Sequence, residues 1–410
     1  MDRSFSPPSL IDWKFDVPED VGNTADVIIM GASTRAAAFS ALRAGFRPYC
    51  LDPFGDDDTG VHTRFQRVDD YPNGLIRILK SLPPWPVIYT GGLENRPDIL
   101  EGITESHPLW GNNEAAVSRA RHPQGLEEAA RLARMGMPEW RDESNPPPAD
   151  GTWLLRPLRG AGGRGILRWT EENRDSATLQ EPHLFQKRVE GLPFSAVFIA
   201  SALVGDVRFV GMTRQLIGEA TCHAAEFQWC GNIGPLALPV PVENIIRRFG
   251  NVLKWKLGLL GLFGVDMVIT PENIPYVTEV NPRYPASLEL LEHATGQPLF
   301  ADHCRCFTNQ ELPRTRWNRA HPGEFMGKAI YYSPRDLELT RPVADASTVT
   351  YEEFPVMTDL PAMGVPIHRG DPVCTLFAEA YSADQTWLLL QECLAKFDQR
   401  LAASSVSESA

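Results

Sequence analysis

Short apolar runs in the first 110 residues alternate with a helical pattern. Residues 34–44 are rich in Ala, and Gly45 follows them, which predicts a helix capped by Ser33 or Thr34. The runs around this helix are typical of buried parallel strands and lie at residues 26–30, 48–52 and 86–90. A strand–helix–strand series of this kind predicts a parallel sheet with right-handed crossovers.

The pattern changes twice farther along the chain. Helical patterns at residues 112–121 and 126–135 precede a breaker, Asn145-Pro146-Pro147-Pro148, and glycine-rich strands follow it. After Asn309, prolines interrupt any long helix, and short strands precede a last helical pattern at residues 384–401. The expected division is an irregular lead-in, a parallel α/β domain, a strand-rich middle domain, a small β-rich C-terminal domain and a disordered tail, at residues 1–25, 26–120, 121–310, 311–401 and 402–410.

Composition adds limits to this picture. The 410 residues are too many for one core and suit two or three domains, and 43% hydrophobic with 22% charged residues is ordinary for a globular protein. No apolar signal region follows Met1, and no apolar stretch approaches the ~20 residues of a membrane span. We therefore expect a soluble protein located in the cytoplasm.

The seven cysteines are scattered, which argues against a disulfide framework. Cys304 and Cys306 lie beside His303, but no second Cys pair stands at zinc-ligand spacing, so buried free thiols are favoured over a metal site. The net charge of −13 disfavours nucleic acid and anionic membranes as partners. A local concentration of arginines around residues 156–168 still allows an anionic substrate.

The turn from Gly31 to Arg35 follows the first strand, where a Rossmann fold binds a dinucleotide. It has one glycine where the G-x-G-x-x-G fingerprint has three, so close approach of a pyrophosphate is disfavoured. We interpret the first domain as Rossmann-like but degenerate, touching substrate at its switch point rather than binding NAD.

A glycine-rich loop carries the first chemical signal. The sequence from Trp153 to Ile166 predicts a strand, a loop with four glycines in six residues, and a second strand. Such a loop exposes backbone N–H groups to phosphate oxygens, although a plain hairpin with a flexible tip is the simpler alternative. The flanking arginines favour anion binding, and they are Arg156, Arg159 and Arg164.

A strand–turn–strand segment carries the stronger signal. Residues 262–270 and 274–283 predict two antiparallel strands joined by a turn, which would place Asp266 opposite the stretch from Glu279 to Asn281. Two carboxylates and a carboxamide are the hard oxygen ligands that Mg²⁺ at nucleotide phosphates requires. A surface hairpin with solvated acids is the alternative, but Glu279 lies in an apolar strand.

The order of these elements resembles the ATP-grasp superfamily, whose members include carboxylate–amine ligases, biotin carboxylase, carbamoyl phosphate synthetase and D-alanine–D-alanine ligase. The resemblance covers residues 26–310, and Glu-Val-Asn-Pro-Arg at residues 279–283 is its most specific piece. It implies a mixed α/β and α+β architecture with a Rossmann-like N-terminal domain, an ATP-grasp module and a small β-rich C-terminal domain.

The resemblance also implies roles for single residues. Asp266, Glu279 and Asn281 would hold Mg²⁺ (or Mn²⁺) for ATP, and Arg283 would hold the substrate carboxylate or the transferring phosphoryl group. Arg156 stands where the family usually has lysine, which keeps the charge but alters its geometry. Residues 184–191 resemble the interdomain hinge of the family, in which backbone from Lys187 to Val189 would read the adenine edge and Glu190 or a nearby acid would bind the ribose. The residues implied at the nucleotide are Gly160, Gly162, Gly163, Arg164, Gly165, Lys187, Arg188, Val189 and Glu190.

The implied function is an ADP-forming ligase that joins a small-molecule carboxylate to an amine through an acyl phosphate. Residues 359–375 resemble the C-terminal domain of biotin-carboxylase-like members, and the chain also resembles the tyramine–glutamate ligase group of one-carbon cofactor biosynthesis. A bicarbonate-activating enzyme and a non-catalytic nucleotide-binding protein stay open as alternatives. His223, in a segment expected to line the acceptor pocket, is a structural histidine or a general base. A homodimer is compatible with this architecture.

Overall fold

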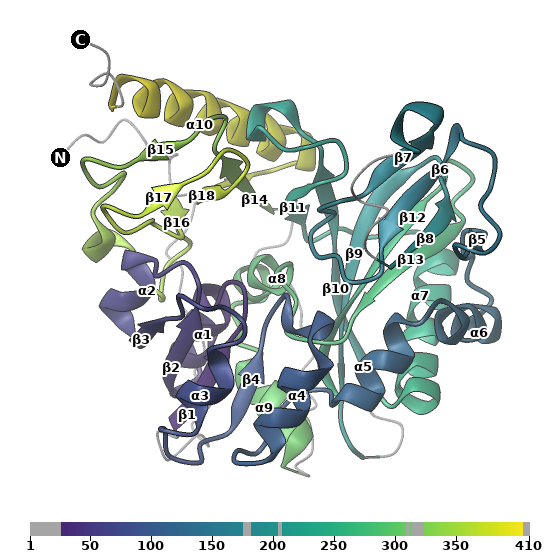
Figure 1. Cartoon of the computed structure of the whole chain (residues 1–410), viewed down its shortest axis with the longest axis horizontal. Coiled ribbons are helices and arrows are strands. Elements are labelled where there is room, and N and C mark those ends of the chain that lie inside the picture. Colours follow the sequence, from purple (N-terminus) through teal and green to yellow (C-terminus); the bar gives the residue numbers. More distant parts are fainter. Residues whose placement is uncertain (1–25, 175–181, 204–206, 309–311, 313–323, 405–410) are drawn as a thin grey trace.

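Three main sheets organise the chain (Figure 1). The computed structural model describes residues 26–174, 182–203, 207–308, 312 and 324–404. The expected lead-in at residues 1–25 lies outside this range, as do residues 405–410 of the expected tail. The mixed α/β and α+β architecture predicted from the sequence is confirmed.

The N-terminal sheet is parallel and has the strand order β3-β2-β1-β4. Its strands are β1 (Asp26–Met30), β2 (Arg47–Asp52), β3 (Arg64–Arg67) and β4 (Val87–Tyr89). Its helices are α1 (Arg35–Arg43), α2 (Asp57–His62), α3 (Leu75–Leu79) and α4 (Pro97–Thr104). The winding reverses at β1, so the carboxyl ends of β1 and β4 form the crevice in which such sheets bind ligands.

The large sheet is antiparallel and has the order β13-β12-β9-β10-β11-β14-β18-β16. Its strands are β9 (Leu192–Ala200), β10 (Val207–Ile217), β11 (Trp229–Gly234), β12 (Gly261–Ile269), β13 (Pro275–Asn281), β14 (Phe325–Tyr332), β16 (Met357–Thr358) and β18 (Pro372–Ala380). Because β11 pairs with β14, this sheet runs across the expected boundary near residue 310. The division into domains stays a proposal, with the C-terminal strands sharing the sheet of the middle region.

A small antiparallel sheet faces the large one and has the order β5-β8-β6-β7. Its strands are β5 (Trp140–Arg141), β6 (Asp150–Pro157), β7 (Leu167–Thr170) and β8 (His183–Lys187). The glycine-rich loop joins β6 to β7, so the expected strand–loop–strand is confirmed. A separate two-stranded ribbon pairs β15 (Leu337–Glu338) with β17 (Pro366–Ile367).

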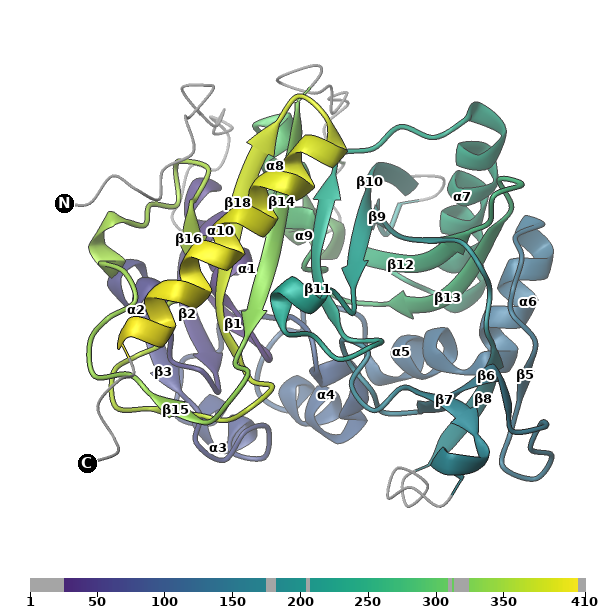
Figure 2. The ribbon, with the colours of Figure 1, turned by 90° about the horizontal axis from the view of Figure 1, so that it is seen from above.

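Helices cover the outer faces of these sheets. In Figure 2, α10 lies along β14 and β18, while α6 and α7 pack together at the opposite end of the large sheet. The remaining helices are α5, α8 and α9, and the bounds are α5 (Glu114–Arg121), α6 (Pro123–Ala133), α7 (Val240–Val252), α8 (Leu288–Thr295), α9 (Phe300–Phe307) and α10 (Ala383–Ser404). Helix α10 confirms the helix expected at residues 384–401 and continues three residues into the expected tail. Among the described helices, none combines the length and apolar character needed to cross a membrane.

A close helix–sheet contact fixes the core behind β9 and β12. The rings of Phe198 and Phe263 stack at 5.4 Å between centroids. Gly250 of α7 lies directly against them, because a Cβ there would stand 2.4 Å from Cε1 of Phe198. A helix interior ordinarily prefers Ala to Gly by about 1 kcal/mol, so packing overrides propensity at this position.

We therefore predict that Gly250→Ala destabilises the protein by about 1–3 kcal/mol despite the better helix former, because the core would be overpacked. Gly60→Ala in α2 is the matched control, since no atom lies within 4 Å of a Cβ built there. Urea unfolding of both variants measures the difference. A G250A variant as stable as G60A would contradict the packing argument.

Candidate active site

A cavity of about 910 Å³ lies between the small sheet and the large sheet. One end is bounded by β6, β8 and the glycine-rich loop, and the other by the carboxyl ends of β1 and β4 together with β14 and β18. Three parts of the chain that are distant in sequence therefore share one space. The predicted site residues on its wall are Arg156, Gly162, Gly163, Arg164, Lys187, Arg188, Val189, Asp266, Glu279, Asn281 and Arg283.

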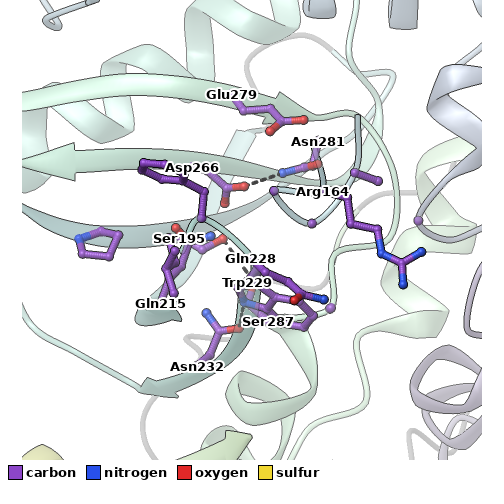
Figure 3. A pocket seen from close by; sticks show the side chains of 18 of the residues that line it. Arg164, Ser195, Gln215, Gln228, Trp229, Asn232, Asp266, Glu279, Asn281 and Ser287 are labelled. Carbon is purple, nitrogen blue, oxygen red and sulfur yellow. Dashed lines mark hydrogen bonds between the residues drawn. The ribbon is translucent and has the colours of Figure 1, made fainter. Parts of the chain in front are cut away.

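The carboxylate strands pair as the sequence predicts. In the antiparallel register of β12 and β13, Asp266 lies opposite Glu279, and Asn281 donates a hydrogen bond of 2.8 Å from Nδ2 to Oδ2 of Asp266 (Figure 3). The register shifts just after Asp266, leaving Thr278 as a bulge residue. Bulges of this kind re-aim groups next to active sites. Here the carbonyl of Thr278 accepts a hydrogen bond from Arg156 at 2.9 Å.

The electrostatics of this pair suit a divalent cation. Burial and then the charge of Glu279 raise the pKa of Asp266 to about 6. Burial alone would also raise the pKa of Glu279, but the charges of Arg121 and Arg156 lower it. The carboxylates of Asp266 and Glu279 repel each other, and the carboxamide of Asn281 lies beside them. These groups are the kinds of oxygen ligand that Mg²⁺ prefers. Within the described residues no three His, Cys, Asp or Glu side chains are grouped for a metal. The carboxamide of Asn281, hydrogen-bonded to Asp266, is the candidate for a third ligand.

Two arginines hold Glu279 from opposite sides. Nη1 of Arg121 lies 2.9 Å from Oε1, and Nη2 of Arg156 lies 3.1 Å from Oε2. Arg156 also donates to Oε1 of Gln186 at 2.8 Å, so its guanidinium fork ties the small sheet to β13. Arg121 was not predicted, because it ends helix α5 and lies 158 positions from Glu279 in the sequence. A basic residue in the last turn of a helix has an ordinary explanation in the helix dipole, so no sequence signal marks it.

Arg283 connects the carboxylates to the N-terminal domain. Its Nε donates to Oε1 of Glu94 at 3.0 Å, and its Nη2 donates to Oδ1 of Asn281 at 3.1 Å. Burial would lower the pKa of Arg283, but the charges of Glu94, Asp266 and Glu279 raise it, so the guanidinium stays charged. A Cβ at Gly91 would stand 3.5 Å from this guanidinium, which places Arg283 at the crevice of the parallel sheet.

The glycine-rich loop lies against the segment before β11. A Cβ at Gly163, whose φ is +77°, would come within 1.9 Å of the carbonyl oxygen of Phe227, so only glycine fits this approach. The carbonyl of Gly162 accepts a hydrogen bond from the backbone N–H of Trp229 at 3.0 Å. Arg164 points away from the carboxylates (Figure 3) and donates to the carbonyl of Gly370 at 3.2 Å. Gly160 and Gly165 do not line the cavity.

Two backbone N–H groups of the hinge segment, residues 184–191, are already used in hydrogen bonds within the protein. The backbone N–H of Lys187 donates to the carbonyl of Glu139, and that of Arg188 donates to the carbonyl of Thr152. These donors are therefore used within the small sheet, which leaves the backbone of Val189 as the better candidate to read a base edge. Glu190 lies off the cavity wall and forms an ion pair with Arg188 at 2.7 Å.

His223 and His303 both make contacts of the kind that structural histidines make. Nε2 of His223 lies 3.2 Å from Oδ1 of Asp398, off the cavity wall, although Glu226 and Phe227 of its segment do line the cavity. Nδ1 of His303 accepts the backbone N–H of Leu262 at 2.9 Å, and burial lowers its pKa to about 4, so this ring is neutral. Cys304 and Cys306 are buried free thiols.

The family model of the ATP-grasp domain matches residues 126–287, the range that contains the small sheet, the glycine-rich loop and the carboxylate strands. This part of the chain is therefore an ATP-grasp domain. The predicted enzyme class, an ADP-forming ATP-grasp ligase, is confirmed at this level, while the metal and the individual site residues remain proposals.

Sequence relatives of the chain include an uncharacterized protein of Methanocaldococcus jannaschii, 21% identical over 406 residues that cover 93% of this chain and 94% of the relative. The carbamoyl phosphate synthase large chain of Pseudomonas aeruginosa is 23% identical over 278 residues, covering 63% of this chain. The match spans only 25% of that synthase.

Solved structures share the fold over nearly the whole length. The ADP complex of an N5-carboxyaminoimidazole ribonucleotide synthetase has a TM-score of 0.66 at 16% identity, covering 95% of this chain and 99% of that one. An L-amino acid ligase from Bacillus licheniformis has a TM-score of 0.68 at 12% identity, covering 90% and 97%. The fold shared with these structures thus includes the N-terminal and C-terminal parts of this chain.

The raised pKa of Asp266 predicts that its ionised form lowers the stability of the folded protein. Because the folded pKa of about 6 exceeds the unfolded 3.8, the ionised carboxylate disfavours folding above pH 6, and this cost disappears as the pH falls toward 4. Asp266→Asn should therefore stabilise the metal-free protein by roughly 1–3 kcal/mol near neutral pH and change little at about pH 4. Calorimetry at both pH values tests this. A D266N variant that melts below the wild type near neutral pH would refute the charge argument.

Proposed function

We propose that this ATP-grasp protein is a carboxylate–amine ligase acting on small molecules. ATP would phosphorylate a carboxylic acid to its acyl phosphate, an amine would displace the phosphate, and the products would be an amide, ADP and phosphate. The observation that carries the proposal is the cavity that joins the Asp266–Glu279–Asn281 cluster to the glycine-rich loop on one side and to an open crevice on the other. Such an arrangement would allow a phosphoryl donor to lie beside its acceptor.

The nucleotide end would hold Mg²⁺ (or Mn²⁺) through Asp266, Glu279 and Asn281, and the ion would neutralise charge on the phosphates. Arg156 adds a fixed positive charge from the small sheet, and the backbone of the loop around Gly162 and Gly163 offers N–H groups to phosphate oxygens. The protein's contribution is positioning and charge neutralisation, with no covalent intermediate on the chain.

The substrate end would bind the acid and then the amine. Arg283 lies between the metal-ligand cluster and the Gly91–Gly92 backbone, where its guanidinium would orient a carboxylate toward the phosphoryl group. Beyond it the cavity wall includes the polar side chains of Ser33, Thr90 and Lys328. A location in the cytoplasm, a homodimer and a place in one-carbon cofactor biosynthesis remain predictions.

A bicarbonate-activating reaction is the second candidate. Ligand pockets usually measure about 300–1,000 Å³, and this cavity is near the upper end of that range. The space favours an organic acid and an amine beside the nucleotide over bicarbonate alone. A non-catalytic role is disfavoured because all three metal-ligand candidates face one another at the cavity.

The reaction class is tested by ADP release. Purified protein with Mg-ATP is screened against carboxylic acids paired with amines, and then against bicarbonate with and without amines. The ligase proposal expects ADP only when an acid and an amine are both present. Stimulation of ADP release by bicarbonate in the absence of any organic acid would overturn the ligase proposal in favour of a bicarbonate-activating reaction.

Replacing Glu279 by Gln is expected to lower ADP formation at least about 10³-fold, because one metal-ligand charge is removed where phosphoryl-transfer charge develops. Glu272→Gln, in the exposed turn between β12 and β13, is the matched control and should keep full activity. Steady-state ADP formation is the measurement. Turnover by E279Q near that of E272Q would exclude the proposed metal site.

A further inference from the structure

A short turn of the N-terminal domain contacts two of the three arginines at the metal-ligand cluster, Arg283 and Arg121. The turn η2 (Leu93–Asn95) follows Gly91 and Gly92, which line the cavity at the carboxyl end of β4. Glu94 accepts a hydrogen bond from Arg283, as described above, and its side chain is 1% exposed. The neighbouring residue, Asn95, contacts Arg121.

Asn95 makes two contacts with the nucleotide half of the site. Its Oδ1 accepts a hydrogen bond from Nη2 of Arg121 at 3.0 Å, and its Nδ2 donates to the carbonyl of Gly160 at 3.2 Å. The same Nη2 of Arg121 also donates to the carbonyl of Gly160 at 3.1 Å. Asn95, Arg121 and Gly160 therefore form a closed triangle of hydrogen bonds at the first residue of the glycine-rich loop.

The triangle is joined directly to the metal-ligand cluster. The other terminal nitrogen of Arg121, Nη1, holds Oε1 of Glu279 at 2.9 Å. A displacement of Asn95 would thus act on the loop through Gly160 and on Glu279 through Arg121. Asn95 and Gly160 themselves are absent from the cavity wall, so both contacts work from behind the site.

We propose that Asn95 is a positioning residue through which the N-terminal domain sets the geometry of the glycine-rich loop and of Glu279 for the nucleotide. This inference rests on the proposed function, because it requires Mg-nucleotide to bind between that loop and Glu279. A side chain in the domain that carries the substrate crevice would thereby determine how tightly the nucleotide is held.

A purely structural role for Asn95 would make a different prediction. A contact that only joins two domains changes the melting temperature and leaves nucleotide affinity alone. A positioning contact changes nucleotide affinity and depends on its partner Arg121. The two roles are separated by measuring affinity and melting temperature on the same variants.

The experiment measures binding of Mg-ADP to the full chain by calorimetry for the wild type, Asn95→Ala, Arg121→Ala and the double variant. We expect N95A to weaken binding about tenfold, and the loss in the double variant to be clearly smaller than the sum of the two single losses, because both side chains hold the same Gly160 carbonyl and each other. Asn73→Ala is the matched control, since Asn73 also bonds an arginine, Arg96, on the same domain. It should bind Mg-ADP like the wild type.

A second readout follows the loop itself. Trypsin cleaves after Arg159 and Arg164, and saturating Mg-ADP should protect both bonds in the wild type and in N73A. Asn95→Asp keeps the shape and the acceptor for Arg121 but loses the donor to Gly160, so protection should be reduced in N95D even where folding is unaffected. This variant keeps the test valid if N95A folds poorly.

The outcomes separate the two levels of inference. If the wild type binds no Mg-nucleotide, the proposed function fails and this inference fails with it. If the wild type binds Mg-ADP while N95A and N95D match N73A in affinity and protection, only the positioning role is overturned. Strictly additive losses in the double variant would also overturn it, since the two residues would then act independently.

Discussion

The site depends on how Glu279 is held. Glu279 lies between the buried Val277 and Val280 of β13, and its carboxylate is partly buried at the cavity, where burial favours the neutral form. Arg121 and Arg156 offset that cost from two directions, and each also bonds a second element, Gly160 in one case and Gln186 in the other. The charge needed at the site therefore also fixes the small sheet and helix α5 against β13. Removing either arginine would leave a partly buried charge with one partner, which is the costly arrangement.

The sequence predicts the elements that have strong local patterns. Strands β1, β2 and β4, helix α10 and the β12–β13 pair with Asp266 opposite Glu279 follow from apolar runs, period-two alternation and turn residues. Strand β3 was missed because Arg64-Phe65-Gln66-Arg67 is polar and largely exposed at the sheet edge. Edge strands bury little, so their sequences carry little of the strand signal.

Contacts between distant segments account for the rest. Glu94, Asn95 and Arg121 meet the loop and the carboxylate strands only after folding, and no periodicity or spacing relates position 121 to position 279. The hinge at residues 184–191 is a second place where the sequence does not specify the contacts that the backbone makes. The family resemblance implies that backbone from Lys187 to Val189 reads the adenine edge. In the structure the N–H groups of Lys187 and Arg188 donate to the carbonyls of Glu139 and Thr152. Backbone hydrogen bonds are a matter of tertiary pairing, which one sequence does not specify.

The continuity of the large sheet limits how the cavity can open. Its eight strands are joined edge to edge from β13 to β16, so the metal-ligand strands and the C-terminal strands belong to one hydrogen-bonded body. The small sheet has its own core of Trp153, Leu155, Trp169 and Phe185 and pairs with none of those eight strands. Within the described chain, the small sheet can therefore move away from the large sheet as a unit without breaking a β-ladder. Such a movement must break the contacts of Arg156 with β13 and the hydrogen bonds that the Gly160 carbonyl accepts from Asn95 and Arg121.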